Sequence, residues 1–367
     1  MKPCEPHTLP LDGLDFTSMI PLLGQANRAL ARYDGLLAGL INPSVLLSPL
    51  TTKEAERSSR IEGTQADLGD VYQYEAGVEM NEMLAQDSQE IINYRKTLIV
   101  AEDYLRERPL GLTLIKSMHG ILLDSVRGQN KQPGQFRKEQ NWIGPRGCSM
   151  EEATYVPPSP LRLLDHLENW EFYLQHKEVD PVIQTAIIHA QFEIIHPFLD
   201  GNGRLGRLMV PLFLFQSGVL AYPMFYLSEY LEAHRDEYYE RLNAVTGKDD
   251  WIGWIRFFLE AVVEQAKVNS EKARGISNLY DEMKDRIHDA THSQYAIALL
   301  DSIFDRPIFN SSYLQNKTGV QKNTLMTLLR QLRNANIIKT LIPASGRRPA
   351  TMVFPGIINI VEGKKVF

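Results

Sequence analysis

The chain has 367 residues, 44% apolar and 23% charged, which is ordinary folded material and long enough for two or three domains with their own cores. This composition excludes a disordered chain. The two cysteines, Cys4 and Cys148, exclude a disulfide framework or a cysteine metal cluster and fit a reducing compartment. The N-terminus lacks a basic stretch before an apolar core, and no run of about 18 apolar residues occurs, so we expect a cytoplasmic protein without a membrane span.

The net charge of −6 is spread unevenly along the chain. The segment Ser311–Ala350 has no Asp or Glu and carries +7, which leaves −13 for the remainder. Its basic residues are Lys317, Lys322, Arg330, Arg333, Lys339, Arg347 and Arg348. One end of the chain is therefore locally basic.

The first part of the chain reads as helices broken by Pro and Gly. Apolar positions over 20–40 recur at helical spacing, and Asn42-Pro43-Ser44 ends that element. A second helix is expected over about 51–63, because Thr51 and Glu54 have capping-box spacing and Gly63 is typical of a helix end. Further helical patterns cover 87–106 and 112–123.

Between Gly128 and Pro160 the pattern changes to Gly, Pro and aromatic residues. Here Phe136–Ile143 and Thr154–Val156 are predicted to pair as a β-hairpin. Helices resume near Leu161, Pro181, Arg204, Leu227 and Trp251, and the last of them is long and amphipathic, over 251–289.

The part that starts near His292 has a different order of elements. It reads as a helix over 295–304, a helix pair over 311–317 and 321–334, and a small hairpin over 337–353. That order resembles a winged helix-turn-helix.

The segment Val182–Ile195 is apolar at helical spacing, and Pro197 disfavours a helical conformation for its predecessor, so His196 is expected at a helix C-terminus. The apolar run Leu205–Phe215 begins a second helix just after Gly201-Asn202-Gly203. Both glycines are able to adopt positive φ, so backbone N–H groups can converge there. The helix N-terminus adds unpaired donors, and Arg204 and Arg207 project from one face. The loop is predicted to hold several phosphates.

Two further side chains add chemistry to this loop. Asp200 supplies a hard oxygen ligand of the kind that Mg²⁺ takes when water and phosphate fill most of its shell. His196, whose unperturbed pKa is about 6.5, can accept a hydroxyl proton near neutral pH. The combination suits phosphoryl or nucleotidyl transfer, where positioning and charge neutralisation supply most of the rate.

Each of these residues taken singly has an ordinary structural explanation: a turn, a solvated face, or a helix-end histidine. Two alternative sites fail on spacing. A calcium loop counted from Asp200 puts Leu205 where Gly is needed and Pro211 where Glu is needed. A di-iron site at Glu193 and His196 lacks its second Glu-x-x-His, and no Walker A run is present.

At these residues the sequence resembles the Fic family. His196 to Arg207 matches the signature His-Pro-Phe-x-Asp-Gly-Asn-Gly-Arg-x-x-Arg at every specified position. The segments Ser88–Leu98, Gln132–Val156 and Tyr226–Tyr239 also look like longer bacterial Fic proteins with a C-terminal winged helix. The resemblance implies a mainly α fold, a Fic helical core with a β-hairpin flap, plus a C-terminal winged-helix domain.

The resemblance also implies an activity, the transfer of AMP from ATP to a Ser, Thr or Tyr hydroxyl of a target protein, with Mg²⁺. His196 would be the general base and Asp200 the Mg²⁺ ligand. The residues that would contact phosphates are Gly201, Asn202, Gly203, Arg204 and Arg207. The domains expected are an N-terminal helical region over 1–85, the catalytic core over 86–270, a helical linker over 271–292 and the winged helix over 293–367.

The helix over about 51–63 ends in Ser58-Ser59-Arg60-Ile61-Glu62-Gly63. A Glu at a helix C-terminus opposes the macrodipole by about 0.3–1 kcal/mol, and on local sequence it reads as a solvated residue before a capping Gly. The spacing Ser-x-x-x-Glu-Gly resembles instead the inhibitory motif of Fic proteins whose obstructing helix precedes the core. That resemblance implies that Ser58, Glu62 and Gly63 are inhibitory and that Glu62 pairs with Arg207.

Several alternatives stay open. Fic loops in related proteins also transfer UMP, phosphocholine or phosphate, or remove AMP. The strand over 136–143 is expected to hold a target peptide by strand addition or only to pack. Self-modification is expected, a homodimer is left open, and no membrane partner is expected. In the other class of function the chain is a DNA-binding regulator, with the basic end on DNA and the Fic body as a sensor.

Overall fold

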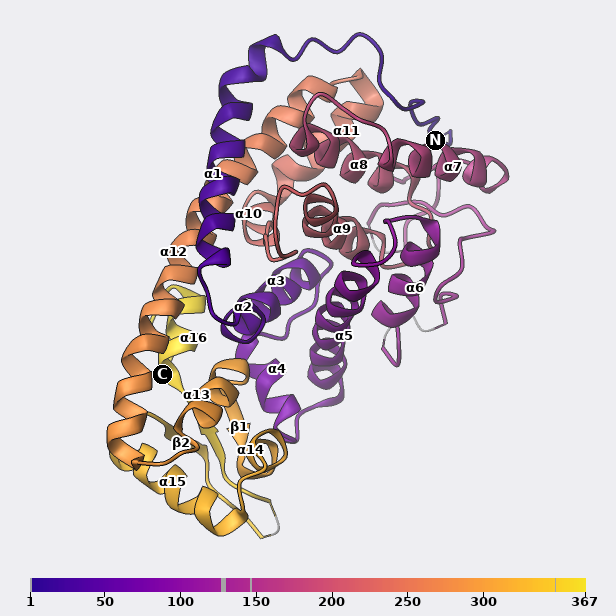
Figure 1. Cartoon of the computed structure of the whole chain (residues 1–367). Helices are drawn as coiled ribbons and strands as arrows, with labels where there is room; N and C mark the ends of the chain where they lie inside the picture. Colours follow the sequence, from indigo (N-terminus) through magenta and orange to yellow (C-terminus); the bar gives the residue numbers. More distant parts are fainter. Residues whose placement is uncertain (1, 127–129, 146, 347) are drawn as a thin grey trace. The chain divides into compact units, whose positions relative to one another are not determined.

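The computed structural model describes residues 2–126, 130–145, 147–346 and 348–367. Gly128 and Arg347, named above, lie outside these residues. The chain is mainly helical, as predicted, with one small three-stranded sheet (Figure 1). Within the described ranges, none of the helices has the length and apolar character that a membrane span requires.

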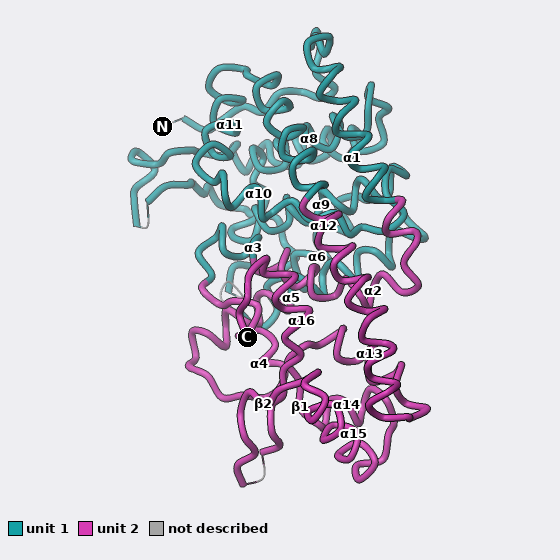
Figure 2. Tube along the Cα trace, turned by 90° about the vertical axis from the view of Figure 1, so that its left-hand side faces the viewer, with its two compact units in different colours: residues 1–34, 57–64, 93–267 teal, residues 35–56, 65–92, 268–367 magenta. Residues whose placement is uncertain are grey.

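The chain forms two compact units, each built from separate segments (Figure 2). Unit 1 comprises residues 1–34, 57–64 and 93–267, and unit 2 comprises 35–56, 65–92 and 268–367. Four helices contribute residues to both units: α1 (Ile20–Ala38), α3 (Ser48–Ile61), α5 (Glu82–Leu105) and α12 (Trp251–Thr291).

The centre of unit 1 is helix α8 (Pro181–Ile195), which is buried on nearly all sides because its residues are apolar almost all round. Helix α9 (Asn202–Gln216) packs along it, and two indole N–H groups, of Trp170 and Trp254, donate to its backbone carbonyls. The remaining elements of unit 1 are the short helices η1 (Thr17–Met19) and η2 (Pro160–Arg162) and the helices α6 (Leu112–Leu122), α7 (Leu163–Leu174), α10 (Ser228–Ala233) and α11 (Arg235–Lys248).

Both ends of α8 follow from local sequence. The Asp180 side chain accepts a hydrogen bond from the backbone N–H of Val182 at 2.7 Å, and Pro181 occupies the first helical turn. At the other end His196 caps the helix in the left-handed conformation. The predicted helix end at His196 is therefore confirmed.

Unit 2 contains the sheet and the predicted helix pair. The strands β1 (Ile308–Asn310), β2 (Lys339–Ile342) and β3 (Thr351–Val353) form an antiparallel sheet in the order β1-β3-β2, in which Val353 lies opposite both Ile308 and Lys339. Its helices are α2 (Pro43–Leu46), α4 (Leu68–Glu75), α13 (Ala296–Asp305), α14 (Ser311–Thr318), α15 (Lys322–Asn334) and α16 (Pro355–Glu362). The helix pair and the hairpin that follows are confirmed, and the winged-helix interpretation stays a prediction.

Three predicted features differ in the structure. Helix α3 begins at Ser48, so Thr51 lies inside it, its hydroxyl donates to the Leu47 carbonyl, and the predicted capping box does not exist. The predicted hairpin is reduced, within the described residues, to a single antiparallel bridge between Ile143 and Tyr155. The segment 271–292 is helical as expected but continues α12 to Thr291, and the four-part domain division stays a prediction.

Candidate active site

His196 stands at the junction of α8 and the signature loop in an unusual backbone conformation. Its φ of 49° and ψ of 61° lie in the left-handed region, which residues other than glycine seldom adopt. Pro197 disfavours the right-handed helical conformation for His196, and the chain leaves the helix here. The imidazole thereby sits at the start of the loop instead of on the helix surface.

Arg137 holds this helix end from outside the signature. Its Nε donates to the His196 carbonyl oxygen at 2.9 Å, and a guanidinium nitrogen donates to the Pro158 carbonyl at 2.6 Å and more weakly to that of Ile195 at 3.4 Å. The last carbonyls of a helix lack partners inside the helix and favour a cation. Arg137 is 2% exposed, and burial lowers its pKa to about 10, so it remains charged at neutral pH.

The imidazole of His196 is set up to accept a proton. Its Nδ1 lies 3.3 Å from the carbonyl oxygen of Glu193, which can only accept, so Nδ1 carries the hydrogen and Nε2 is the basic nitrogen. Burial lowers the pKa of His196 to about 4, although the Glu193 carbonyl and the Glu62 carboxylate oppose this shift. The imidazole is therefore neutral near pH 7, as a general base requires, and the same shift makes Nε2 a weaker base than that of a free imidazole.

The glycine-flanked loop begins α9 earlier than expected. The helix starts at Asn202, so Gly201 alone takes positive φ, 79°, and Gly203 is helical, contrary to the prediction for both glycines. The buried Asn202 side chain bonds both backbone groups of Phe198, each at 2.9 Å, which closes the loop. A phosphate contact of Asn202 is thus left to its backbone N–H at the helix N-terminus.

Asp200 lies in the same loop, directly before Gly201, and its side chain is 41% exposed. Its Oδ1 accepts from the Gly201 N–H at 2.6 Å and from Arg204 at 3.3 Å, and Oδ2 has no hydrogen bond among the described residues. The described residues contain no group of three or more His, Cys, Asp or Glu that would hold a metal unaided. A single accessible carboxylate beside a phosphate site fits Mg²⁺, which keeps water and phosphate as its other ligands.

His119 of α6 braces the same loop. Its Nδ1 accepts from the Gly134 N–H at 2.7 Å, so its Nε2 carries the hydrogen and donates to the Asp200 carbonyl at 3.0 Å. The ring stacks on Phe198 with centroids 3.8 Å apart. Burial lowers the pKa of His119 to about 4, so the ring stays neutral and keeps this arrangement.

The predicted pair between Glu62 and Arg207 is present. Glu62 Oε1 lies 2.6 Å from a terminal nitrogen of Arg207, whose Nε donates to the Ser58 hydroxyl at 2.8 Å and whose terminal nitrogen donates to the Ser58 carbonyl at 2.9 Å. Burial opposes ionisation of Glu62, but Arg207 foremost lowers its pKa below the usual value. Gly63, at φ 100°, ends the helical turn next to Glu62. Two of the three guanidinium nitrogens of Arg207, a side chain that is 2% exposed, are thus bonded to Ser58 and Glu62.

Arg204 and Gly203, the remaining predicted residues, lie in the first turn of α9. Arg204 is 4% exposed and reaches the Asp200 carboxylate, so it turns toward the loop. Gly203 lies against the Glu62 carboxylate and Arg207, and a Cβ atom here would collide with that carboxylate. Glycine at 203 therefore leaves the room that the ion pair occupies.

Glu193 of α8 is a second carboxyl near Arg207, half-buried as a residue but with its Oε1 atom buried. Its Oε1 has no hydrogen-bond partner among the residues that the structure describes, and it lies so close to Gly206 that a Cβ atom there would collide with it. Burial, reinforced by Glu62 and opposed by Arg207, raises the pKa of Glu193 to about 8, so it is protonated at neutral pH.

His189 ties the three helices around this carboxyl together. Its Nδ1 donates to the Gly206 carbonyl at 2.9 Å, and its Nε2 accepts from the Tyr238 hydroxyl at 2.9 Å. These bonds join α8 to α9 and to α11. Burial lowers the pKa of His189 to about 4, so the ring is neutral.

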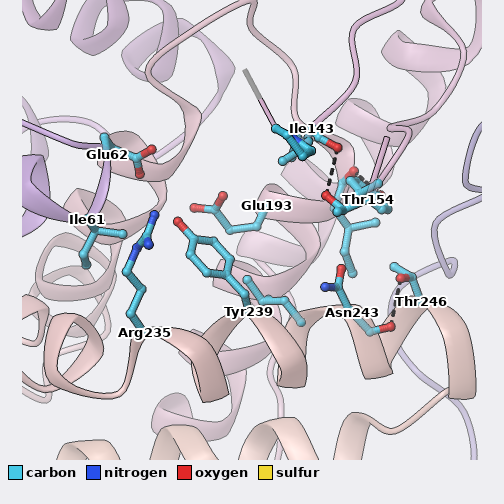
Figure 3. A pocket seen from close by; sticks show the side chains of 14 residues that line it. Ile61, Glu62, Ile143, Thr154, Glu193, Arg235, Tyr239, Asn243 and Thr246 are labelled. Carbon is cyan, nitrogen blue, oxygen red and sulfur yellow. Dashed lines mark hydrogen bonds between the residues drawn. The ribbon is translucent and has the colours of Figure 1, made fainter. Parts of the chain in front are cut away.

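A cavity of about 560 Å³ opens between the end of α3, the Ile143–Tyr155 bridge, α8 and α11. Glu62 and Glu193 line one part of it, and Tyr239 and Asn243 of α11 line another (Figure 3). The Tyr239 hydroxyl points toward the two carboxyl groups in this view. The volume and the mixture of aromatic and amide side chains suit a small planar ligand.

Sequence reasoning missed four residues of this site: Arg137, His119, Glu193 as a neutral carboxyl, and Asn243. Polar side chains inside otherwise apolar helical stretches signal buried contacts, and His119 and Glu193 carry that signal. Nothing local marks Arg137, because its partners His196 and Pro158 lie far away in the sequence, or Asn243, because a cavity lined by separate segments appears only in the folded chain.

The comparisons with known proteins agree with this geometry. The models "Fic/DOC family N-terminal" and "Fic/DOC family" match residues 20–103 and 109–214, together about half of the chain. A protein adenylyltransferase Fic from Aedes aegypti is 30% identical over 186 residues, which are 50% of this chain but 32% of that protein. A probable protein adenylyltransferase from Aquifex aeolicus is 36% identical over 87 residues, 23% of this chain and 27% of that protein.

Solved structures share the fold. A Fic family protein from Desulfovibrio desulfuricans has a TM-score of 0.59 and 20% identity over 96% of this chain and 98% of that chain. Fic-1 from Caenorhabditis elegans has a TM-score of 0.52 and 21% identity over 71% of this chain and 76% of that chain. With both parts of the family pattern matched and the fold shared, the chain belongs to the Fic/DOC family.

Proposed function

We propose that this protein transfers AMP from ATP to a Ser, Thr or Tyr hydroxyl of a protein, itself included. The observation that carries the proposal is a neutral imidazole with a basic Nε2 at the entrance of a loop whose N–H groups and two arginines suit phosphates. Curated relatives named protein adenylyltransferase support it, although the matches cover only about a third of their length.

In the proposed reaction, Nε2 of His196 removes the proton from the target hydroxyl. The hydroxyl oxygen attacks the α-phosphorus of ATP, the bond to the bridging oxygen breaks, and pyrophosphate leaves with the electron pair. The proton on His196 passes to solvent or to the leaving group. Arg204, Arg207 and the N–H groups that begin α9 stabilise the charge on the phosphates.

Mg²⁺ would be held by Asp200 and would neutralise phosphate charge when bound. We place the adenosine part of ATP in the cavity of about 560 Å³, against Tyr239 and Asn243. A nucleotide with its phosphates at the signature loop and its adenosine in the cavity would pass Glu62, which lines the cavity and also contacts Arg207.

In this proposal Glu62 is the residue that inhibits the reaction. Ser58 and Glu62 occupy Nε and one terminal nitrogen of Arg207, which hinders a phosphate from binding there, and the Glu62 carboxylate repels the negative charge of ATP. Transfer is therefore expected to be slow until the end of α3 moves away from Arg207.

Other reactions on the same loop compete with this proposal. The complete pair Arg204 and Arg207 favours a nucleoside triphosphate over a donor without one, and the retained His196 favours transfer. Removal of AMP, with Glu62 acting on water, uses the same residues. The mass added to or lost from a modified protein separates these reactions.

The decisive experiment incubates wild type, Glu62→Gly and His196→Ala with ATP labelled at the α-phosphate. We expect weak self-labelling of wild type, strong labelling of Glu62→Gly and none of His196→Ala. Label from the γ-phosphate, measured in parallel, should not be incorporated. Equal labelling of all three proteins would refute both His196 as the general base and Glu62 as the inhibitory residue.

A further inference from the structure

The segment from Arg306 to Val361 in unit 2 contains no Asp or Glu, although the whole chain has 45 acidic residues among 367. At that average frequency several acidic residues would be expected in a segment of this length. The same segment has Arg306 and the seven basic residues of Ser311–Ala350. An acid-free, basic segment in an acidic chain is typical of a surface that meets a polyanion.

The fold of unit 2 gives this segment a helix with one buried and one exposed face. Gly319, at φ 69°, ends α14 and turns the chain into α15. Four leucines bury one face of α15: Leu325, Leu328, Leu329 and Leu332. The opposite face is exposed and consists of Lys322, Asn323, Thr324, Met326, Thr327, Arg330, Arg333 and Asn334. In Figure 1 α15 lies on the outside of unit 2.

The basic residues of the segment that the structure describes, which leave out Arg347, divide into two groups. Arg306 pairs with Glu75 at 2.9 Å, Lys317 pairs with Asp305 at 3.1 Å, and Arg348 pairs with Glu79. In contrast, no carboxylate among the described residues lies within ion-pair distance of Lys322, Arg330 or Arg333 on α15, or of Lys339 on β2. The uncompensated charge therefore gathers on the exposed face of α15 and the adjoining strand.

We propose that the exposed face of α15, with Lys339 of β2, binds duplex DNA, with α15 in the major groove. The groove admits one α-helix, basic side chains contact phosphates, and Asn, Thr and Arg are side chains that bond base edges. Met326, 50% exposed, is the one large apolar side chain that α15 presents, so this face is poorly suited to an apolar protein partner. The proposal is independent of the transfer reaction.

The test measures fluorescence anisotropy of a labelled duplex of about 30 base pairs, roughly three helical turns, with the full chain. Salt is varied between about 50 and 200 mM, because each phosphate contact adds about 0.9 to the slope of log affinity against log salt. We expect binding at low salt, and in the double variant Lys322→Gln/Arg330→Gln a loss of about tenfold or more with a slope lower by about 2.

The matched control is Lys364→Gln/Lys365→Gln, which removes two exposed charges of unit 2 outside this face and should change affinity less than about twofold. Circular dichroism and the melting temperature establish that both variants fold. No binding at low salt, or an equal loss in both double variants, overturns the proposal. Equal competition by poly-L-glutamate at the same charge concentration also overturns it, because the face would then suit an acidic protein as well as DNA.

Discussion

Arg137 Nε donates a hydrogen bond of 2.9 Å to the backbone carbonyl of His196, the residue that we propose as the general base. The two residues are 59 positions apart in the chain. This bond and the restriction from Pro197 together hold His196 in a left-handed conformation that its neighbours in α8 do not share. The direction of the imidazole therefore depends on a side chain outside the signature.

We expect Arg137→Lys to slow transfer while leaving nucleotide binding nearly intact. A lysine ammonium cannot bond the Pro158 and His196 carbonyls in the same fork, so the helix end shifts. A displacement of about 1 Å at a reacting group can reduce a rate by about 10²-fold. The rate is measured as self-labelling in the Glu62→Gly background, and ATP binding by titration calorimetry. Arg162→Lys, at an exposed arginine of the same unit, is the control, and equal rates in both variants would contradict the role of Arg137.

Ser58→Ala should partly relieve the inhibition of transfer by Glu62. The variant loses the hydroxyl that accepts from Arg207 Nε, but it keeps the Ser58 carbonyl and Glu62. A hydrogen bond to a charged group is worth about 1.5 kcal/mol, so self-labelling should rise roughly tenfold and stay below that of Glu62→Gly. Ser59→Ala removes a neighbouring buried hydroxyl that has no hydrogen-bond partner in the described parts of the chain, and it should have no effect. A fall in labelling for Ser58→Ala would mean that Ser58 positions Arg207 for catalysis instead.

The stability of the fold should fall as the medium becomes acidic. Burial lowers the pKa values of His119 and His189 to about 4 in the folded protein, whereas both titrate near pH 6.5 when unfolded. Between these values the unfolded chain binds more protons, so the free energy of unfolding decreases as pH falls from about 6.5 to 4, by roughly 1–3 kcal/mol per histidine. Urea unfolding at several pH values measures this, and His119→Gln should flatten the dependence. An unchanged slope in that variant would exclude the contribution of His119.

Glu193 should act in the opposite direction on the alkaline side. Its pKa, raised from 4.5 to about 8, means that the folded protein binds the extra proton between those values, so stability is lost as pH rises toward 8. Above about pH 6.5 the histidines no longer contribute, and a decrease of about 2 kcal/mol between pH 6.5 and 8 is expected for wild type. Glu193→Gln should remove this decrease. The same decrease in wild type and variant would show that another group titrates.

Asn243→Leu should weaken ATP binding by roughly tenfold, because an amide that lines the proposed adenosine cavity is replaced by an apolar group of similar size. The comparison is made in the Glu62→Gly background with ATP and GTP, and the preference for ATP should decrease. Gln175→Leu, at an exposed amide of the same unit outside the cavity, is the control. Unaltered affinity for both nucleotides would mean that the nucleobase binds outside this cavity.

Much of the site was predictable from the chain alone. His196 at a helix end, Gly201 at positive φ and a helix just after the loop follow from Pro197, from the glycine and from an apolar run, and all of these are local effects. The pairing of Glu62 with Arg207 was also anticipated, but from resemblance, because nothing local joins two residues 145 positions apart. The start of α3 and the extent of the hairpin were predicted wrongly, since capping and strand patterns are weak against tertiary packing.

The sequence by itself determined which chemical groups the loop carries: an imidazole, a carboxylate, two arginines and a glycine, Gly201, at which the backbone turns. Only the tertiary structure decided their states. Burial keeps His196 and His119 neutral and Glu193 protonated, and it leaves Arg207 engaged by Ser58 and Glu62. The reason is that desolvation and hydrogen bonding depend on every side chain packed around a group, and those come from distant segments that no local pattern specifies.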